Sequence, residues 1–179
     1  MTRLLVLGML DIQPMSGYDI QIMLKMSDAE RWGGVLIGSI YHALKKLESE
    51  NLIEITSIEQ TGHRQKAVYH ITPLGQEHLK KLVRDSLQLS SVQYPSTMYS
   101  ALSFIDKISA DEAKKTLDEQ YTQLENELRI VECGLNAKRE FMKDSMPPMT
   151  MLIFENMFGI INQQKEFVKK ALKLIEEQK

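Results

Sequence analysis

The sequence predicts a mainly α-helical protein with a small β-hairpin in its first half and two long helices in its second half. Three observations point to this fold class. Seven of the nine glycines lie in residues 1–84, which is typical of short elements joined by frequent turns. Two short runs of alternating apolar and polar residues in that half indicate strands. From residue 117 onward, apolar residues recur at intervals of four and three, as in long packed helices. We therefore expect two domains, residues 1–84 and 85–179.

The chain is expected to begin with two short helices. An apolar run over residues 4–10 predicts a buried helix that ends before Pro14, because proline lacks an N–H and disfavours helix in the residue before it. Ser16 follows, with an acidic residue, Asp19, three positions later. This spacing predicts a reciprocal cap at the start of a second helix.

A third helix is expected to begin with Ser39 as its N-cap. Its inward face is formed by Ile40, Leu44 and Leu47, which follow the i, i+4, i+7 spacing of a buried helix face. Asn51 stands where a left-handed C-terminal cap belongs, and asparagine tolerates that conformation.

Two strands and a further helix complete the first half. Residues 53–56 and 69–72 alternate between apolar and polar, and a polar, glycine-containing loop over residues 60–66 separates them. Thr72 followed by Pro73 predicts an N-cap and the first helical position of the next helix. The order is helix, helix, helix, strand, strand, helix, which is that of a winged helix-turn-helix domain.

The second half contains two heptad patterns that predict helix–helix packing, within one chain or between chains. Two long helices alone leave apolar positions uncovered, so we expect a homodimer. The dimerisation residues expected from these patterns are Leu117, Tyr121, Leu124, Leu128, Phe154, Phe158, Ile161, Val168, Leu172 and Ile175.

In a winged helix the third helix enters the major groove of double-stranded DNA, and the wing reaches the neighbouring backbone or minor groove. Lysines neutralise phosphates, while hydroxyl groups near a helix N-terminus add hydrogen bonds to them. The alternative is that this face and the loop are merely solvated. The candidate DNA-binding residues are Ser16, Ser39, Tyr41, His42, Lys45, Lys46, His63, Arg64 and Lys66.

Taken alone, a formal net charge of −2 opposes a nucleic-acid partner, but the charge is unevenly spread. Residues 31–47 and 60–76 together carry five basic and no acidic residues, which leaves −7 on the rest of the chain. A dimer therefore presents basic segments on an acidic scaffold, and such segregation is compatible with DNA binding.

The first half resembles the PadR family of transcriptional regulators over about residues 3–80. The motifs that carry the resemblance are Leu4–Leu10, Pro14–Ile20, Trp32-Gly33, Gly38–Glu48, Leu52-Ile53 and Tyr69–Gly75. The long helical second half is similar to the subgroup with a C-terminal dimerisation region. The resemblance implies a homodimeric repressor that binds an inverted repeat. It also implies that Ser39, Tyr41, Lys45, Arg64 and Lys66 touch DNA.

The resemblance further implies a small effector, because inducers in this family include phenolic acids and hydrophobic drugs. Aromatic side chains and adaptable thioethers form pliable apolar pockets. The alternative interpretation is that these residues belong to the core and the helix seams. The candidate pocket residues are Trp32, Tyr94, Met98, Tyr99, Phe154 and Phe158.

Other function classes lack their motifs. The four histidines and the single cysteine, Cys133, show no zinc-ligand spacing, so neither a metal nor a cofactor is expected. Residues 33–38 have glycines at P-loop spacing, but Ser39 and Ile40 follow where Lys-Ser or Lys-Thr is needed, and we expect no enzyme. No apolar run is long enough to cross a membrane, and a lone cysteine fits a reducing compartment, so a cytoplasmic protein is expected.

One alternative function remains open at this stage. A dimeric helical protein whose winged helix binds another protein instead of DNA has the same element order. Binding to DNA with a strong salt dependence distinguishes a DNA-binding protein from such an interaction module.

Overall fold

The computed structural model describes residues 1–61, 64–89, 92, 94–143 and 145–177. They form two compact units, residues 1–92 and 93–179. Helix α5 runs unbroken from Pro73 to Gln88, so the division falls after the end of this helix and not at residue 84. Among the described residues, no helix combines the length and apolarity needed to cross a membrane.

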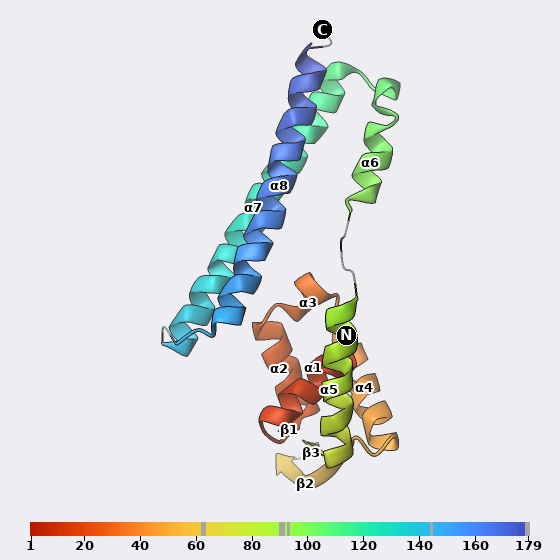
Figure 1. Ribbon diagram of the computed structural model, residues 1–179, viewed down its shortest axis with the longest axis vertical. Coiled ribbons are helices and arrows are strands. Elements are labelled where there is room, and N and C mark those ends of the chain that lie inside the picture. The colour runs from red at the N-terminus through yellow and green to blue at the C-terminus, as the bar shows by residue number, and fades with distance from the viewer. Residues whose placement is uncertain (62–63, 90–91, 93, 144, 178–179) are drawn as a thin grey trace. The chain divides into compact units, whose positions relative to one another are not determined.

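The first unit is a winged helix-turn-helix domain, as predicted. Its helices are α1 (Thr2–Ile12), α2 (Gly17–Met26), α3 (Ala29–Gly33), α4 (Ile37–Ser49) and α5 (Pro73–Gln88), and its strands are β1 (Met15–Ser16), β2 (Ile53–Thr61) and β3 (Arg64–Ile71). The three strands form an antiparallel sheet in the order β1-β3-β2. The hairpin of β2 and β3 is the wing (Figure 1).

Three predicted caps are confirmed. The Ser16 hydroxyl accepts a hydrogen bond from the Asp19 N–H at 3.3 Å, and the Asp19 carboxylate accepts one from the Ser16 N–H at 3.1 Å. Thr72 caps α5 by accepting a bond from the Gly75 N–H at 3.0 Å. Asn51 adopts φ +59°, the left-handed conformation expected of it. Each cap satisfies backbone groups that a helix end leaves unpaired.

The predicted start of α4 was wrong. The helix begins at Ile37, with Leu36 as its N-cap, three residues before the expected position. The Ser39 hydroxyl donates to the Leu36 carbonyl at 2.6 Å instead of accepting from a helix N–H. The predicted inward face is confirmed, since Ile40, Leu44 and Leu47 are all fully buried in the core.

Two elements were missed, β1 and α3. Strand β1 has only two residues and forms because β3 pairs with it, a partner more than fifty residues away. Helix α3 lies in a mostly polar stretch, and its one buried residue, Ala29, gives no periodic pattern. The strands of the wing are also longer than expected, because they extend into the predicted loop as far as Thr61 and Arg64.

Gly75 allows the start of α5 to pack against the backbone at Leu52, between α4 and β2. A Cβ atom at this position meets the Leu52 carbonyl oxygen at 2.0 Å and the Ile71 side chain at 2.8 Å. Gly75→Ala is therefore expected to lower the free energy of unfolding by about 3 kcal/mol, because backbone has to move. Urea denaturation measures this. Gly8→Ala is the control: nothing lies within 4 Å of its Cβ, and we expect stabilisation of about 0.5–1 kcal/mol. Equal effects contradict the close packing.

The second unit consists of α6 (Ser96–Leu102), a 3₁₀ turn (Ile105–Lys107), α7 (Ala110–Met142) and α8 (Pro148–Glu177). Helices α7 and α8 lie side by side as an antiparallel hairpin (Figure 1). The seam between them buries Leu117, Val131, Leu135, Ile161 and Val168, of which Val168 is fully enclosed.

The residues expected at a dimer interface contribute to the hairpin within one chain. All ten lie on α7 or α8 and are buried or half-buried in the hairpin of one chain, namely Leu117, Tyr121, Leu124, Leu128, Phe154, Phe158, Ile161, Val168, Leu172 and Ile175. The heptads therefore account for the pairing of α7 with α8 within one chain, and the use of these residues by a second copy stays a prediction.

Candidate nucleic-acid interface

Helix α4 has one buried face and one exposed polar face. The buried residues Ile40, Ala43, Leu44 and Leu47 hold the helix on the core. The exposed face carries Tyr41, His42, Lys45, Lys46 and Ser49. Among the described residues neither Lys45 nor Lys46 takes part in an ion pair, so both ammonium groups are available to an external anion.

Tyr41 is held in place by a close approach of α2 to α4. A Cβ atom at Gly17 meets the Tyr41 ring at 2.8 Å and the Leu44 side chain at 3.0 Å, so this crossing depends on the absence of a side chain. The ring of Tyr41 remains half-exposed. A tyrosine held in this way offers its hydroxyl to a partner with little loss of side-chain freedom.

The two serines predicted to bind DNA, Ser16 and Ser39, are less exposed than the polar residues of α4 and use their hydroxyls within the protein. Ser16 is only 1% exposed and its hydroxyl belongs to the cap of α2, so Ser16 is withdrawn as a DNA contact. Ser39 is half-buried, and its hydroxyl lies 3.2 Å from that of Thr2 in addition to its bond with Leu36. Periodicity alone did not reveal these internal partners.

The wing supplies the remaining candidates. His63 lies outside the described residues. Arg64 is the first residue of β3, and its side chain lies outside what the structure describes. Lys66 is half-buried, and its ammonium group forms an ion pair with Asp19 at 2.9 Å. The sequence gives no signal for this pair, because 47 residues separate its members.

The pair changes the ionisation of Asp19. Burial works to raise the pKa of its carboxyl group, but hydrogen bonds from Ser16 and Lys66, together with the charge of Lys66, outweigh burial and hold the pKa below its usual 3.8. The ionised carboxylate is therefore favoured in the folded protein.

A pH dependence of stability follows. Since the pKa of Asp19 is lower in the folded state than in the unfolded state, its stabilising effect is complete above about pH 4 and is lost as the pH falls through the native pKa. We expect the difference in unfolding free energy between the wild type and Asp19→Asn to be constant from pH 7 to 5 and to shrink towards pH 3. Urea denaturation at each pH measures it. A difference that stays constant down to pH 3 contradicts the lowered pKa.

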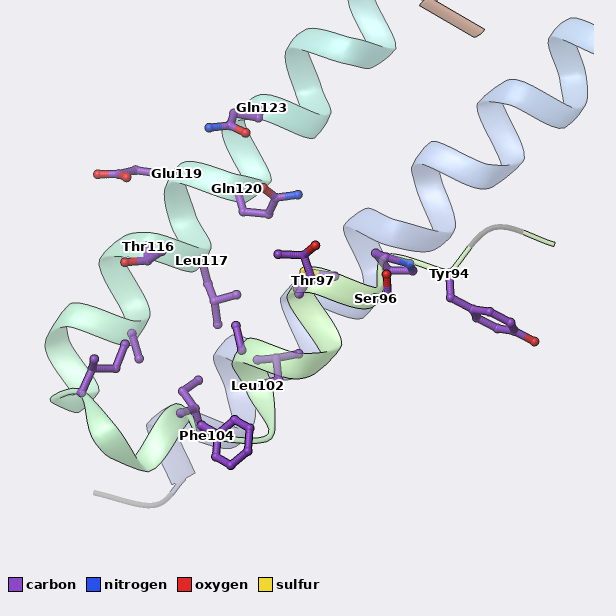
Figure 2. Close-up of a pocket in the computed structure, with 16 residues that line it drawn as sticks. Tyr94, Ser96, Thr97, Leu102, Phe104, Thr116, Leu117, Glu119, Gln120 and Gln123 are labelled. Carbon is purple, nitrogen blue, oxygen red and sulfur yellow. The ribbon is translucent and has the colours of Figure 1, made fainter. Parts of the chain in front are cut away.

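The second unit contains a pocket of about 790 Å³ between α6 and α7. In Figure 2, Leu102 and Leu117 stand on its two walls, while the Glu119 carboxylate extends away from α6. No Lys, Arg or His is among the described lining residues; the polar side chains that line the pocket include hydroxyls, amides and one carboxylate, those of Ser96, Thr97, Thr116, Glu119, Gln120 and Gln123. The pocket is suited to an apolar molecule without negative charge.

The predicted effector residues are dispersed. Tyr94 and Met98 line the pocket. Tyr99 packs edge-on against the Phe167 ring, with centroids 5.6 Å apart. Phe154 and Phe158 belong to the α7–α8 seam, and Trp32 lies in the first unit, where its indole N–H donates to the Ser27 carbonyl. The apolar residues after α6 that complete the pocket, Phe104, Ile105 and Ile108, were missed, although they continue the apolar run after Pro95.

Comparison with known proteins identifies a family for the first half of the chain. Residues 6–81 match the model of the transcriptional regulator PadR-like family, which confirms the resemblance of the first half. No curated protein sequence matches the chain.

Three solved structures share the fold over nearly the whole chain. Bacillus subtilis PadR in complex with operator DNA has a TM-score of 0.77 at 22% identity, covering 97% of this chain and 96% of that chain. B. subtilis PadR in complex with p-coumaric acid has a TM-score of 0.76 at 22% identity, with coverages of 97% and 98%. The Vibrio cholerae virulence activator AphA has a TM-score of 0.72 at 15% identity, with both chains fully covered. At these identities the likeness concerns the fold alone.

Proposed function

We propose that this chain, whose residues 6–81 match the PadR-like family of transcriptional regulators, is a homodimeric repressor and not an enzyme. In this proposal the two copies of α4 occupy successive major-groove half-sites of an inverted repeat, separated by whole turns of about 10 bp. The observation that carries the proposal is the exposed face of α4, where Tyr41, His42, Lys45 and Lys46 stand opposite a fully buried face.

Selection of bound fragments from sheared genomic DNA tests the proposal. The enriched duplex is then compared with a scrambled duplex by fluorescence anisotropy at several salt concentrations. A repressor binds the enriched duplex more tightly, with an affinity that falls steeply with salt. Equal and salt-insensitive binding to both duplexes favours the alternative, an interaction module whose winged helix does not bind DNA. A reporter placed behind the enriched fragment distinguishes repression from the activation named for AphA.

The homodimer is proposed from an uncovered apolar face on the α7–α8 hairpin. Its members are 40% to 77% exposed, and each precedes by one position a residue that is buried or half-buried in the hairpin: Ile130, Phe141, Ile153 and Ile160. In an antiparallel hairpin, positions that precede the seam by one residue on either helix lie on the same side. The four residues therefore form one face, which we call the hairpin face. A soluble monomer rarely leaves such a face open, and a second copy covers it symmetrically.

The α6–α7 pocket is proposed as the effector site. B. subtilis PadR is known in complex with p-coumaric acid, an anion at neutral pH. Here the described lining offers no cation to pair with a carboxylate, so the cost of burying that charge is not offset. The proposal is therefore an uncharged apolar effector, whose binding shifts the population away from the DNA-binding conformation.

Matched ligands test this choice. The methyl ester of p-coumaric acid is expected to raise the melting temperature by about 3–6 °C at ten times its Kd, whereas p-coumarate at the same concentration leaves it unchanged. Ala101→Trp, which fills the pocket, should abolish the shift. Differential scanning fluorimetry measures all three. A shift by p-coumarate equal to that by the ester, or a shift that persists in Ala101→Trp, contradicts the proposed site.

A further inference from the structure

The wing is attached to the helices of its unit along only part of its length. Strand β3 pairs with β1 at two positions, Met15 with Tyr69 and Ser16 with Val68. The ladder ends there because the chain turns into α2 at Gly17. Nearer the tip, the backbone of β3 is paired with β2 alone in the described sheet. The orientation of this outer part therefore depends on side chains.

Lys66 lies just beyond the end of that ladder and reaches α2. Its Nζ atom is 3.0 Å from Oδ1 and 2.9 Å from Oδ2 of Asp19. The two side chains are 30% and 40% exposed, so the pair is only partly screened by water. Asp19 is itself fixed, since its carboxylate also accepts bonds from the N–H and the hydroxyl of the buried Ser16.

The ion pair between Lys66 and Asp19 is connected through α2 to the exposed face of α4. Helix α2 touches α4 through the contact between Gly17 and Tyr41, two residues before Asp19. A side chain that joins β3 to the start of α2 therefore relates the direction of the wing to that of the DNA-facing helix. The pair also carries no net charge, so it adds nothing to the positive surface that phosphates meet.

We propose that Lys66 is a positioning residue, whose ion pair with Asp19 fixes the wing relative to α2 and α4, and that it does not neutralise a DNA phosphate. This inference rests on the proposed binding of DNA by the wing and α4. It reassigns a residue that sequence and family resemblance both place on the DNA. A phosphate has to compete for the ammonium group with a carboxylate at 2.9 Å that Ser16 holds in place.

A charge-neutral double variant separates the two roles. Asp19→Asn with Lys66→Met removes the ion pair but leaves the sum of the two charges at zero, and the asparagine oxygen still accepts from Ser16. The matched control is Glu77→Gln with Lys80→Met, which removes an exposed pair on α5 in the same way. Circular dichroism verifies folding. Lys66→Met alone, which keeps the Asp19 cap, replaces the double variant in the exchange measurement if that variant fails to fold.

Two measurements give the answer. In the free double variant, the backbone amide hydrogens of β2 and β3 are expected to exchange about fivefold faster than in the wild type. This is the size of effect expected from the loss of a partly exposed ion pair. In the control variant their exchange should stay unchanged. Binding to the enriched duplex is expected to weaken by about fivefold per wing, with the same dependence on salt.

The outcomes that overturn the proposal are distinct. A salt dependence that falls by about 0.9 per protomer shows that Lys66 neutralised a phosphate. Unchanged exchange in the wing overturns the proposal whatever happens to the affinity. If the wild-type protein shows no salt-dependent DNA binding, the proposed function fails as a whole, and the exchange data then report only whether the pair orders the wing.

Discussion

Replacing both Lys45 and Lys46 with alanine is expected to weaken binding to the enriched duplex by about 10³-fold at 150 mM salt. The two residues are exposed on α4 and, among the described residues, form no ion pair within the protein. A dimer loses four charge-assisted contacts, and about 1 kcal/mol for each multiplies to this factor. The buried face of α4 is untouched, so stability should change by less than about 0.5 kcal/mol.

The salt dependence of the same variant shows what the lysines contact. If all four contacts are to phosphates, the slope of log K against log salt becomes shallower by about 3.6. A smaller change accompanied by relaxed sequence preference indicates that one lysine reads a guanine edge. The control is Lys170→Ala with Lys173→Ala, which removes equal charge from exposed positions of α8 in the second unit. A comparable loss in this control means that only the overall charge matters, and it contradicts the assignment to α4.

Placing glutamate at both Ile153 and Ile160 is expected to convert the dimer to a monomer. Both side chains lie on the hairpin face and are more than half exposed in one chain. In a symmetric dimer four carboxylates are then buried without partners, which raises the dissociation constant by at least about 10³-fold. The seam residues that hold α7 against α8 are unchanged, so the helical content should remain. Size-exclusion chromatography with light scattering measures the mass.

The control for this variant adds the same charge elsewhere on α8. Asn162→Glu and Gln163→Glu lie at exposed positions that do not precede a seam residue by one. We expect this variant to stay dimeric. A monomeric wild type removes the proposed dimer altogether, whereas a dimer that survives both glutamates on the hairpin face places the interface on another surface. DNA binding by the monomeric variant should also weaken strongly, because the two half-sites are then bound independently.

Local features of the fold were predictable from sequence. The caps at Ser16, Asn51 and Thr72 and the inward face of α4 each depend on residues no more than a few positions apart. Neighbours along a helix are fixed by its pitch, so their pattern is visible in sequence order. The start of α4 is an exception, because the Ser39 hydroxyl donates to the Leu36 carbonyl and does not accept a bond from a backbone N–H.

The candidate site was predictable only in part. Helical periodicity correctly places Tyr41, His42, Lys45 and Lys46 on the exposed side of α4. It does not reveal which of the other candidates already have partners inside the protein. Ser16 is enclosed by the cap of α2, and Lys66 is held by a carboxylate that lies 47 residues away.

By itself, the sequence determined the main helices and the wing hairpin, and hence the winged helix followed by two long helices, but not β1, α3 or the start of α4. These follow from propensity, capping and periodicity, all of which act between near neighbours. Only the tertiary structure decided that the heptads of α7 and α8 pair within one chain, that a pocket opens between α6 and α7, and that Lys66 faces Asp19. The physical reason is that a heptad specifies an apolar face but not its partner, and a charge specifies attraction but not its target. Both are settled when distant parts of the chain come into contact.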